Sequence, residues 1–201
     1  MHTLATSGTL PRMTRRYHHG SLRTAIVVVA REKLRLSPAA PLSLRELARE
    51  VGVSPNAPYR HFPGKDGVEV ALVAEGYREL TRLAEAATVA RRPIRSLVGA
   101  FAQFAATEAP LLSLVNAERF AGRDPASEVA LARDEWFAAL VAVVEAEAGE
   151  LLAHESYRRA AGVWAILLGV TALRAHGARG LLAEELIPDA ESLARSIARG
   201  S

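Results

Sequence analysis

Residues 46–67, ELAREVGVSPNAPYRHFPGKDG, interrupt a sequence that otherwise favours long helices. This stretch contains three prolines and three glycines, whereas its flanks have apolar residues at the spacing of amphipathic helices. The pattern therefore predicts very short helical elements, joined by tight turns, between longer helices.

The first of these short helices has a well-marked start and end. Ser43 and Glu46 have the spacing of a capping box, and Leu42 and Leu47 have that of a hydrophobic staple. Gly52 stands where a left-handed residue commonly follows a helix. The predicted buried face of this helix comprises Leu44, Leu47, Ala48 and Val51.

A second short helix is predicted directly after this turn, with Ser54 as its N-cap and Pro55 at its first position. Pro58 lacks the N–H that would bond the Ser54 carbonyl, so we expect a 3₁₀-like first turn. Pro63-Gly64 is then expected to end this short helix and lead the chain away from it. Two helices across a tight glycine turn are typical of a helix-turn-helix. An αα-corner inside a core is the alternative, but it has little use for four polar-tipped residues: Asn56, Tyr59, Arg60 and His61.

The rest of the chain predicts an all-α protein, because alanine and leucine are abundant and period-two alternation is nearly absent. A first helix is expected from Ser21 to the Ser37-Pro38 pair. A long helix should run from about 67 to 91. Further helices are expected at about 93–107, 110–120, 127–153, 156–176 and 188–199, separated by proline or glycine.

Charge is unevenly distributed along the chain. Residues 1–66 contain 11 Lys/Arg and 4 Asp/Glu, and the remaining residues contain 14 and 18. This asymmetry predicts a basic module for a polyanion joined to an acidic body. We expect a flexible basic arm at 1–16, a basic helix-turn-helix domain at 17–66, and an acidic body at 67–201. Arg12, Arg15 and Arg16 either contact DNA or stay disordered.

Other classes of protein find little support. The chain has no cysteine, which suits the reducing cytoplasm, where we expect the protein to associate with the nucleoid. The apolar run from Ala160 to Leu173 is too short for a membrane span. No nucleophile–base constellation or phosphate loop indicates an enzyme, and His18-His19 does not indicate a metal site. We expect neither cofactor nor metal.

Three segments resemble a TetR-family transcriptional regulator: YHHGSLR at 17–23, LSLRELAREVGVSPNAPYRHFPGKDGVEVAL at 42–72 and VWAILLGVTAL at 163–173. In pattern they are closest to the branch whose C-terminal domain is named for a Trp-His-Gly motif. Trp164 and Gly169 fit that motif, but Leu168 stands where the branch usually has histidine, so no role of that histidine is transferred. The resemblance implies a homodimer whose recognition helices enter successive major grooves.

The resemblance also assigns DNA contacts to individual residues. It places Arg45 near a guanine, where arginine makes the commonest specific contact. Base-edge contacts fall to Ser54, Asn56 and Ala57, and phosphate contacts to Tyr59, His61 and Lys65, with Arg60 as a further cation. From the residues alone, Arg45 also fits a solvated helix face, Asn56 a local Asx bond, and His61 a core histidine.

For the C-terminal body the resemblance implies dimerisation and often a small effector. The helix at about 156–176 is apolar on nearly all sides, so with the helix at 188–199 it is the predicted homodimer interface. The candidate pocket lining is Phe101, Phe104, Asn116, Phe120, Trp136 and Trp164, with Arg119 and His154 as further polar groups. Packing in an ordinary core is the alternative for each of them.

The predicted function is repression from a palindromic operator that a small apolar or amphipathic effector releases. Half-sites one turn apart need reading heads about 34–36 Å apart, so a change of a few ångströms suffices for release. The alternatives are a DNA-binding regulator without a small-molecule ligand and an enzyme with an apolar helical cavity.

Overall fold

The computed structural model describes residues 22–120, 124, 127–175 and 186–200. These residues form eight α-helices and two short 3₁₀ helices, without a β-strand, so the predicted all-α class is confirmed. In chain order the elements are α1 (Leu22–Leu36), α2 (Leu44–Val51), η1 (Ala57–Arg60), α3 (Lys65–Thr88), α4 (Pro93–Thr107), α5 (Ala109–Val115), η2 (Glu118–Phe120), α6 (Glu128–Ala148), α7 (Ala153–Ala175) and α8 (Leu186–Arg199).

Most predicted helices are confirmed, with small shifts at their ends. α4 has its predicted bounds, because Pro93 fixes its first position. The helix predicted at 110–120 divides into α5 and η2 at Asn116. The helix predicted at 127–153 ends earlier, because Gly149 has a φ of 88°. The predicted cap at Ser21, the basic arm and the turn at 177–180 lie outside the described residues.

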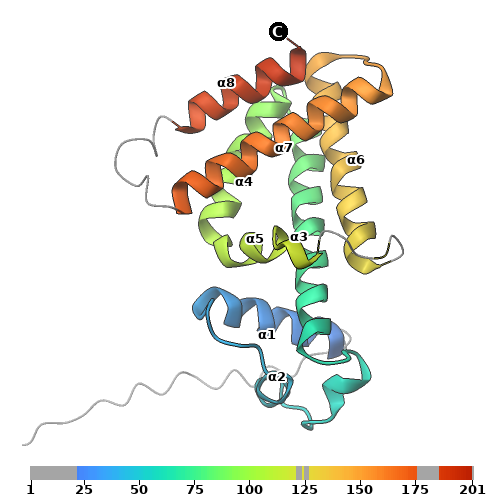
Figure 1. The fold of residues 1–201 in the computed structure, drawn as a ribbon, viewed down its shortest axis with the longest axis vertical. Coiled ribbons are helices and arrows are strands. Elements are labelled where there is room, and N and C mark those ends of the chain that lie inside the picture. Colours follow the sequence, from blue (N-terminus) through green and yellow to red (C-terminus); the bar gives the residue numbers. More distant parts are fainter. Residues whose placement is uncertain (1–21, 121–123, 125–126, 176–185, 201) are drawn as a thin grey trace, which may run out of the picture.

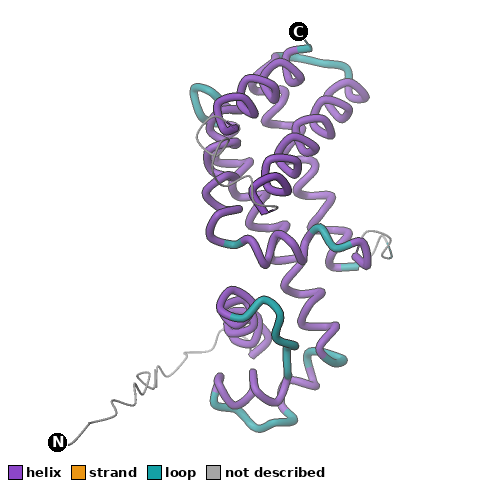
Figure 2. Tube along the Cα trace, turned by 60° about the vertical axis from the view of Figure 1, so that its left-hand side comes forward, coloured by secondary structure: helices purple, strands orange, loops and turns teal. Residues whose placement is uncertain are grey.

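Figure 1 shows two groups of helices joined by one long helix. We call α1, α2 and η1 the head, and α4 to α8 the body. α3 begins in the head and continues into the body, where it packs most extensively against α6. Figure 2 shows the same division after rotation, with the head at the end of the molecule remote from α8. A rigid helix therefore connects the two groups.

One continuous apolar core runs through both groups. It includes Ile26 of α1, Leu47 of α2, Leu72 of α3 and Trp136 of α6. The predicted buried face of α2 is confirmed, with Leu44, Leu47 and Ala48 buried and Val51 half-buried. Burial of about 1.5–3 kcal/mol per large side chain makes this core the main source of stability.

The predicted capping box at the start of α2 is wrong in one respect. Ser43 is the N-cap, but its side chain makes no capping hydrogen bond. Glu46 extends instead toward α1, where its Oε2 lies 3.3 Å from Lys33 Nζ. The staple residue Leu42 packs against the core beside the buried Leu47.

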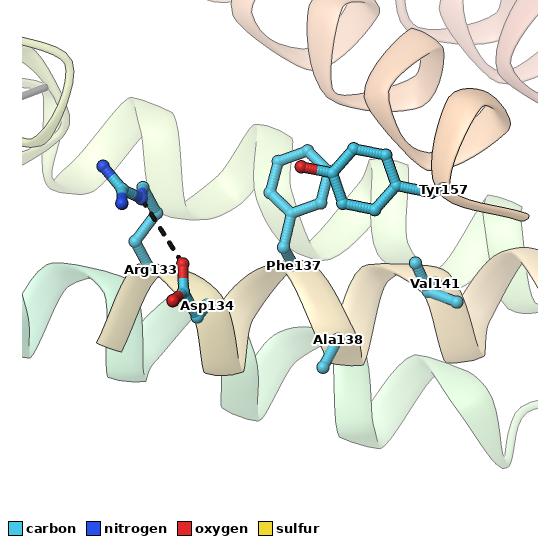
Figure 3. Close-up of a pocket in the computed structure, with 6 residues that line it drawn as sticks. All are labelled: Arg133, Asp134, Phe137, Ala138, Val141 and Tyr157. Atoms are coloured by element: carbon cyan, nitrogen blue, oxygen red, sulfur yellow. Dashed lines mark ion pairs between the residues drawn. The ribbon is translucent and has the colours of Figure 1, made fainter. Parts of the chain in front are cut away.

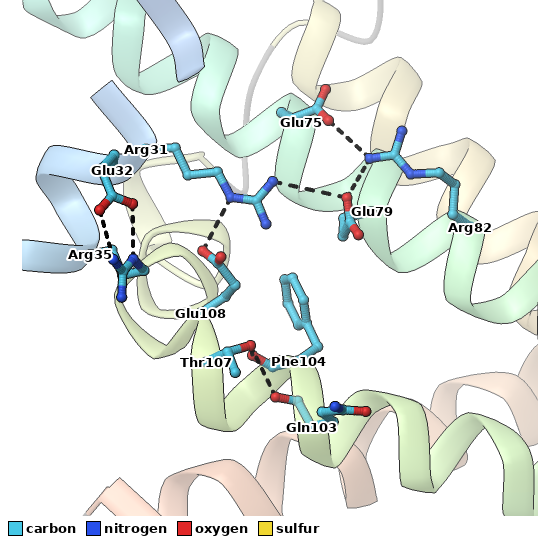
Figure 4. Close-up of polar contacts among 10 residues, drawn as sticks. All are labelled: Arg31, Glu32, Arg35, Glu75, Glu79, Arg82, Gln103, Phe104, Thr107 and Glu108. Atoms are coloured by element: carbon cyan, nitrogen blue, oxygen red, sulfur yellow. Dashed lines mark hydrogen bonds and ion pairs between the residues drawn. The ribbon is translucent and has the colours of Figure 1, made fainter. Parts of the chain in front are cut away.

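Ion pairs at both ends of α1 connect the head to the body. Arg23 pairs with Glu128 at the start of α6, and Arg78 of α3 lies 2.9 Å from the same carboxylate. Arg31 lies 3.2 Å from Glu108, between α4 and α5, and 3.9 Å from Glu79 of α3 (Figure 4). α1 therefore contacts both the α4–α5 corner and the start of α6.

Within the described residues, no single helix has the length and hydropathy of a membrane span. α4 and α5 reach those values only when they are counted together across a bend of 104°.

Candidate nucleic-acid interface

The turn between α2 and η1 has the geometry that the sequence predicts. Gly52 adopts a left-handed conformation, with φ 81° and ψ 29°. Its N–H donates to the Arg49 carbonyl at 3.2 Å, and the Val53 N–H donates to the Ala48 carbonyl at 2.9 Å. These two bonds make the Schellman arrangement that ends a helix. The chain then enters η1 at the end of the head.

The second helix of the motif is shorter and begins later than predicted. It is a 3₁₀ helix from Ala57 to Arg60, with Asn56 rather than Ser54 as its N-cap. The Ser54 carbonyl accepts from the Ala57 N–H at 3.0 Å, a bond to the third residue along. Because Pro58 has no N–H for the α-helical bond to Ser54, the 3₁₀-like geometry expected there is confirmed.

Two residues of this segment face the interior rather than the solvent. Pro58 is buried, and Phe62 just beyond η1 is only 2% exposed. The Arg23 guanidinium of α1 lies 5.6 Å from the centre of the Phe62 ring. Phe62 was missed as a core residue in the sequence analysis, although a phenylalanine between charged residues and Pro63 indicates an anchor. It fixes η1 to α1.

The exit from η1 into α3 is tight. Gly64 is the N-cap of α3, with φ 131°. A Cβ on Gly67 would lie 2.6 Å from Pro63 Cδ, so only glycine fits there without movement of the proline ring. The Pro63-Gly64 exit predicted from the sequence is confirmed. It places the N-terminus of α3, with its unpaired N–H groups, beside η1.

The predicted DNA-contacting residues lie between positions 45 and 65, in the head and at the start of α3. Ala57 is half-buried, and the others are exposed: Arg45, Ser54, Asn56, Tyr59, Arg60, His61 and Lys65. They come from the start of α2, the turn, η1 and the start of α3. Their side chains make no hydrogen bond or ion pair with the described part of the chain.

The other basic residues of the head differ, because every Lys or Arg side chain of α1 is paired. Arg23 and Arg31 bind carboxylates of the body, and Arg35 binds Glu32 within the helix. Lys33 lies 2.9 Å from Glu50, and hydrogen bonds from Lys33 to Glu50 and then Glu46 raise the pKa of its ammonium above the ordinary value. The positive charge of α1 is therefore neutralised internally.

The carboxylates of α2 also lie away from the unpaired cations. Glu46 and Glu50 line a groove of about 560 Å³ between α1 and α2, together with Glu32 and Lys33. This groove also includes the exposed side chains of Val28 and Leu36. α2 thus has acidic side chains on the side that faces α1 and arginines elsewhere, which separates the charges of the head.

One cation on this surface was missed in the sequence analysis. Arg49 is exposed and has no ion-pair partner among the described residues. It follows Arg45 by four residues on α2, which places both guanidinium groups on the same side of the helix. That spacing is visible in the sequence and could have identified Arg49.

The predicted pocket residues of the body divide into two groups. Phe101, Phe104, Phe120 and Trp136 are buried, and Trp164 is half-buried. Asn116 is exposed, and its amide donates to the Leu112 carbonyl at 2.9 Å, so its role in a pocket stays a prediction. Asn116 ends α5, where an amide bonds the free carbonyls of its own helix.

The two further polar groups also lie on the surface. Arg119 pairs with Glu69 at 2.8 Å and covers the Phe120 ring, and His154 is exposed at the start of α7. Among the buried aromatic side chains, Arg119 contacts Phe120 from the surface.

A surface groove of about 550 Å³ lies along α6, beside the start of α7 (Figure 3). The rings of Phe137 and Tyr157 meet there with centroids 5.0 Å apart. An ion pair of 3.6 Å between Arg133 and Asp134 lies at one end. None of the predicted pocket residues lines this groove. Across the described residues, no group of three or more metal-ligating side chains occurs.

The C-terminal motif residues lie on α7. Trp164 and Leu168 are half-buried, and Gly169 is exposed. Membership of the branch named for Trp-His-Gly stays a prediction.

Comparison with known proteins agrees with this geometry. Residues 26–72, from α1 to the start of α3, match the family model of bacterial regulatory proteins of the tetR family. A protein with unknown function from Rhodococcus sp. RHA1 is 31% identical, with a TM-score of 0.73, and the alignment covers 92% of this chain and 98% of that chain.

Two solved regulators share the fold at lower identity. The TetR-family transcriptional regulator PfmR from Thermus thermophilus is 17% identical, with a TM-score of 0.58, over 87% of this chain and 97% of its own. AmtR from Mycobacterium smegmatis is 20% identical, with a TM-score of 0.54, over 92% and 89%. Members of the family bind DNA, function as dimers and are regulators rather than enzymes. Residues 26–72 therefore belong to the tetR family of bacterial regulatory proteins, and the whole chain has the all-helical fold of TetR-family regulators.

Proposed function

We propose that this protein is a repressor that binds a palindromic operator as a homodimer and leaves it when a small effector binds the body. One observation carries the DNA-binding part of the proposal. The cations of the helix-turn-helix are exposed and unpaired within the described residues, whereas those of α1 are all paired. Unpaired Lys and Arg side chains of this kind can neutralise the phosphates of a DNA backbone.

Base reading is assigned to the exposed side chains of the turn and of α2. Arg45 has an unoccupied guanidinium fork, which suits the O6 and N7 acceptors of guanine. Asn56 is the N-cap of η1 but makes no capping hydrogen bond with its side chain, so its amide is available for a base edge. Ser54 and Ala57 are small enough to let the backbone approach the groove.

Phosphate contacts are assigned to the residues that flank η1. Tyr59, Arg60 and His61 lie along η1 and its end, and Lys65 opens α3. The 24-residue helix α3 adds the positive end of its dipole at the same place. We add Arg49 to this set, because it extends the line of cations along α2. These contacts fix the position of the head on DNA without selecting a sequence.

Dimerisation is assigned to α7 and α8, which pack side by side in the body (Figure 1). Ala165 and Gly169 of α7 are exposed, Leu168 is half-buried, and Leu193 of α8 is 55% exposed. Small and apolar residues on adjacent helices permit close approach of a second copy. Such an interface would hold the two heads at the separation that successive major grooves require.

Effector release is assigned to the body interior and to the contacts of α1. An effector that alters the packing of α4, α6 and α7 would move the α4–α5 corner and the start of α6. Glu108 and Glu128 lie at those two places and bind Arg31 and Arg23 of α1. The head would therefore follow a movement of the body through two ion pairs. A displacement of each head by a few ångströms is enough to move the recognition helices out of alignment with successive major grooves.

The test is selection of genomic fragments by the purified protein at physiological salt, followed by titration of the recovered site with candidate metabolites. The proposal expects an inverted repeat that one class of metabolite releases. A repeat that no compound releases would indicate a regulator without a small-molecule ligand. Absence of any enriched sequence would contradict the DNA-binding assignment.

A further inference from the structure

The indole N–H of Trp136 is the buried side-chain polar atom for which the described part of the chain offers no hydrogen-bond partner. Trp136 lies in the middle of α6 and is 0% exposed. Leaving a buried donor unsatisfied destabilises a fold, and a phenylalanine would avoid that cost. A donor kept at this position indicates an acceptor that comes from outside the chain.

The surroundings of Trp136 are aromatic and apolar. Trp164 of α7 lies against it with ring centroids 5.2 Å apart and planes inclined by 67°. Phe101 of α4 also contacts Trp164, with ring centroids 5.8 Å apart and planes inclined by 82°. Leu140, one turn along α6 from Trp136, is also fully buried. The three rings bring together α4, α6 and α7.

The buried polar groups of the body that the structure describes are already used elsewhere. The Ser156 hydroxyl donates to Glu145 at 2.7 Å. The Glu147 carboxylate, 4% exposed, binds Arg199 at 2.7 Å. No charged partner is thus left over for a ligand within this core. A molecule bound among the three rings would be neutral, with an acceptor for one N–H.

Trp164 is the least buried member of the cluster. It is half-buried, whereas Trp136 and Phe101 are at most 1% exposed. Rotation of the Trp164 ring toward the face of α7 that is assigned to the dimer interface would vacate a space of indole size beside Phe101 and Trp136. Because Trp164 belongs to α7, the same movement would act on the helix assigned to the dimer interface.

We propose that the body binds a neutral, planar bicyclic aromatic molecule with one hydrogen-bond acceptor. The Trp136 indole N–H donates to this acceptor, and the molecule takes the place of the Trp164 ring. This inference rests on the proposed function, in which the body holds an effector, and it names the chemistry that the effector presents.

The test uses quinoline and naphthalene, which have the same shape and differ in one ring nitrogen that can accept a hydrogen bond. The chain has two tryptophans, so ¹⁵N-labelled protein gives two indole N–H resonances, assigned with Trp136→Phe and Trp164→Phe. At pH 8, where quinoline is neutral, we expect it to bind about tenfold more tightly than naphthalene and to shift the Trp136 resonance downfield. In Trp136→Phe the two compounds should bind equally.

Several results would overturn the inference. Equal binding of the two compounds to the wild-type protein would overturn it, and this measurement needs no variant. A preference for quinoline that survives Trp136→Phe would place the acceptor elsewhere. A Trp136 resonance already at the position of a hydrogen-bonded indole in the ligand-free protein would mean that internal water satisfies the donor.

Failure of the inference is distinguishable from failure of the proposed function. An effector that releases the operator equally from the wild-type protein and from Trp136→Phe would leave the repressor standing and refute the role of Trp136. Quinoline binding at Trp136 without any compound that releases the operator would support the site and contradict effector release.

Discussion

At the scale of single residues, the basic side chains of the head and of its junction with α3 differ in whether a carboxylate pairs with them. Lys33 and Lys65 illustrate this, because both are lysines that belong to or adjoin the head. Lys33 contacts two carboxylates, whereas Lys65 has no partner in the described part of the chain. A sequence counts both as one positive charge. The structure shows which charge remains for an external anion.

Lys65→Ala should weaken binding to all DNA sequences by a similar factor, because a phosphate contact carries no sequence information. The slope of log affinity against log salt should become shallower by about one unit. Lys33→Ala is the matched control and should leave the slope unchanged. Filter binding or anisotropy over a range of salt concentrations measures both, and equal slopes for Lys65→Ala and the wild type would refute the contact.

Gly52→Ala should lower the free energy of unfolding by about 1–2 kcal/mol, because alanine is strained at the φ of 81° that ends α2. Gly99→Ala is the control. Gly99 lies within α4 with open space around its Cα, so alanine there should stabilise the helix by about 0.5–1 kcal/mol. Chemical denaturation gives both values. Effects of the same sign in both variants would argue against the left-handed turn.

At the scale of elements, most helix ends could be predicted because proline or glycine stands at or near them. Pro93 begins α4 and Gly52 ends α2, as their backbone preferences require. η1 was harder, because a helix of four residues has no periodicity to read and Pro58 disrupts its first turn. Phe62 escaped prediction for the same reason, since burial of an isolated residue depends on tertiary packing.

Side-chain partners across elements were also beyond prediction. Ser43 and Glu46 have capping-box spacing, but Lys33 of α1 draws Glu46 away. Asn116 is a polar residue of the kind expected in a pocket, but its amide donates to the Leu112 carbonyl at the end of its own helix. In each example a local pattern competes with a contact that only the folded chain brings into reach. The exposure of the candidate DNA contacts, by contrast, follows from their places in the motif.

Glu128→Gln should weaken the coupling between body and head, because this carboxylate joins Arg23 of α1 to Arg78 of α3. Amide hydrogen exchange in α1 should become faster, and the ratio of operator affinities without and with effector should fall severalfold. Glu32→Gln is the matched control, since its partner Arg35 lies on the same helix. Equal exchange and equal affinity ratios in the two variants would show that this ion pair transmits nothing.

At the scale of the whole molecule, binding to a palindrome requires two heads at a fixed separation. α3 connects the head to the body (Figure 1), and α7 and α8 are assigned to hold the two copies together. The distance between heads then depends on how the copies pack. A small change at the interface or in the body interior would therefore change the distance between the heads and their alignment with successive major grooves.

Gly169→Arg should make the protein monomeric at micromolar concentration and lower its affinity for a palindrome at least tenfold. A Cβ at Gly169 has open space within its own chain, so the arginine would obstruct a second copy without disturbing the fold. Gly99→Arg is the matched control, because Gly99 is also helical, exposed and unobstructed. Sedimentation velocity distinguishes the outcomes, and a stable Gly169→Arg dimer would refute the interface.

We propose that unpaired cations in and beside the head bind DNA and that Arg45 selects the sequence. The most direct measurement is the affinity of the wild-type protein and of Arg45→Ala for the recovered palindrome and for a scrambled sequence at physiological salt. Arg91→Ala serves as the control, because Arg91 is exposed and unpaired among the described residues but follows the end of α3 remote from the head. Arg45→Ala should lose about 1–3 kcal/mol of binding free energy on the palindrome and much less on the scrambled sequence, whereas Arg91→Ala should change neither value. Equal losses on both sequences would contradict it.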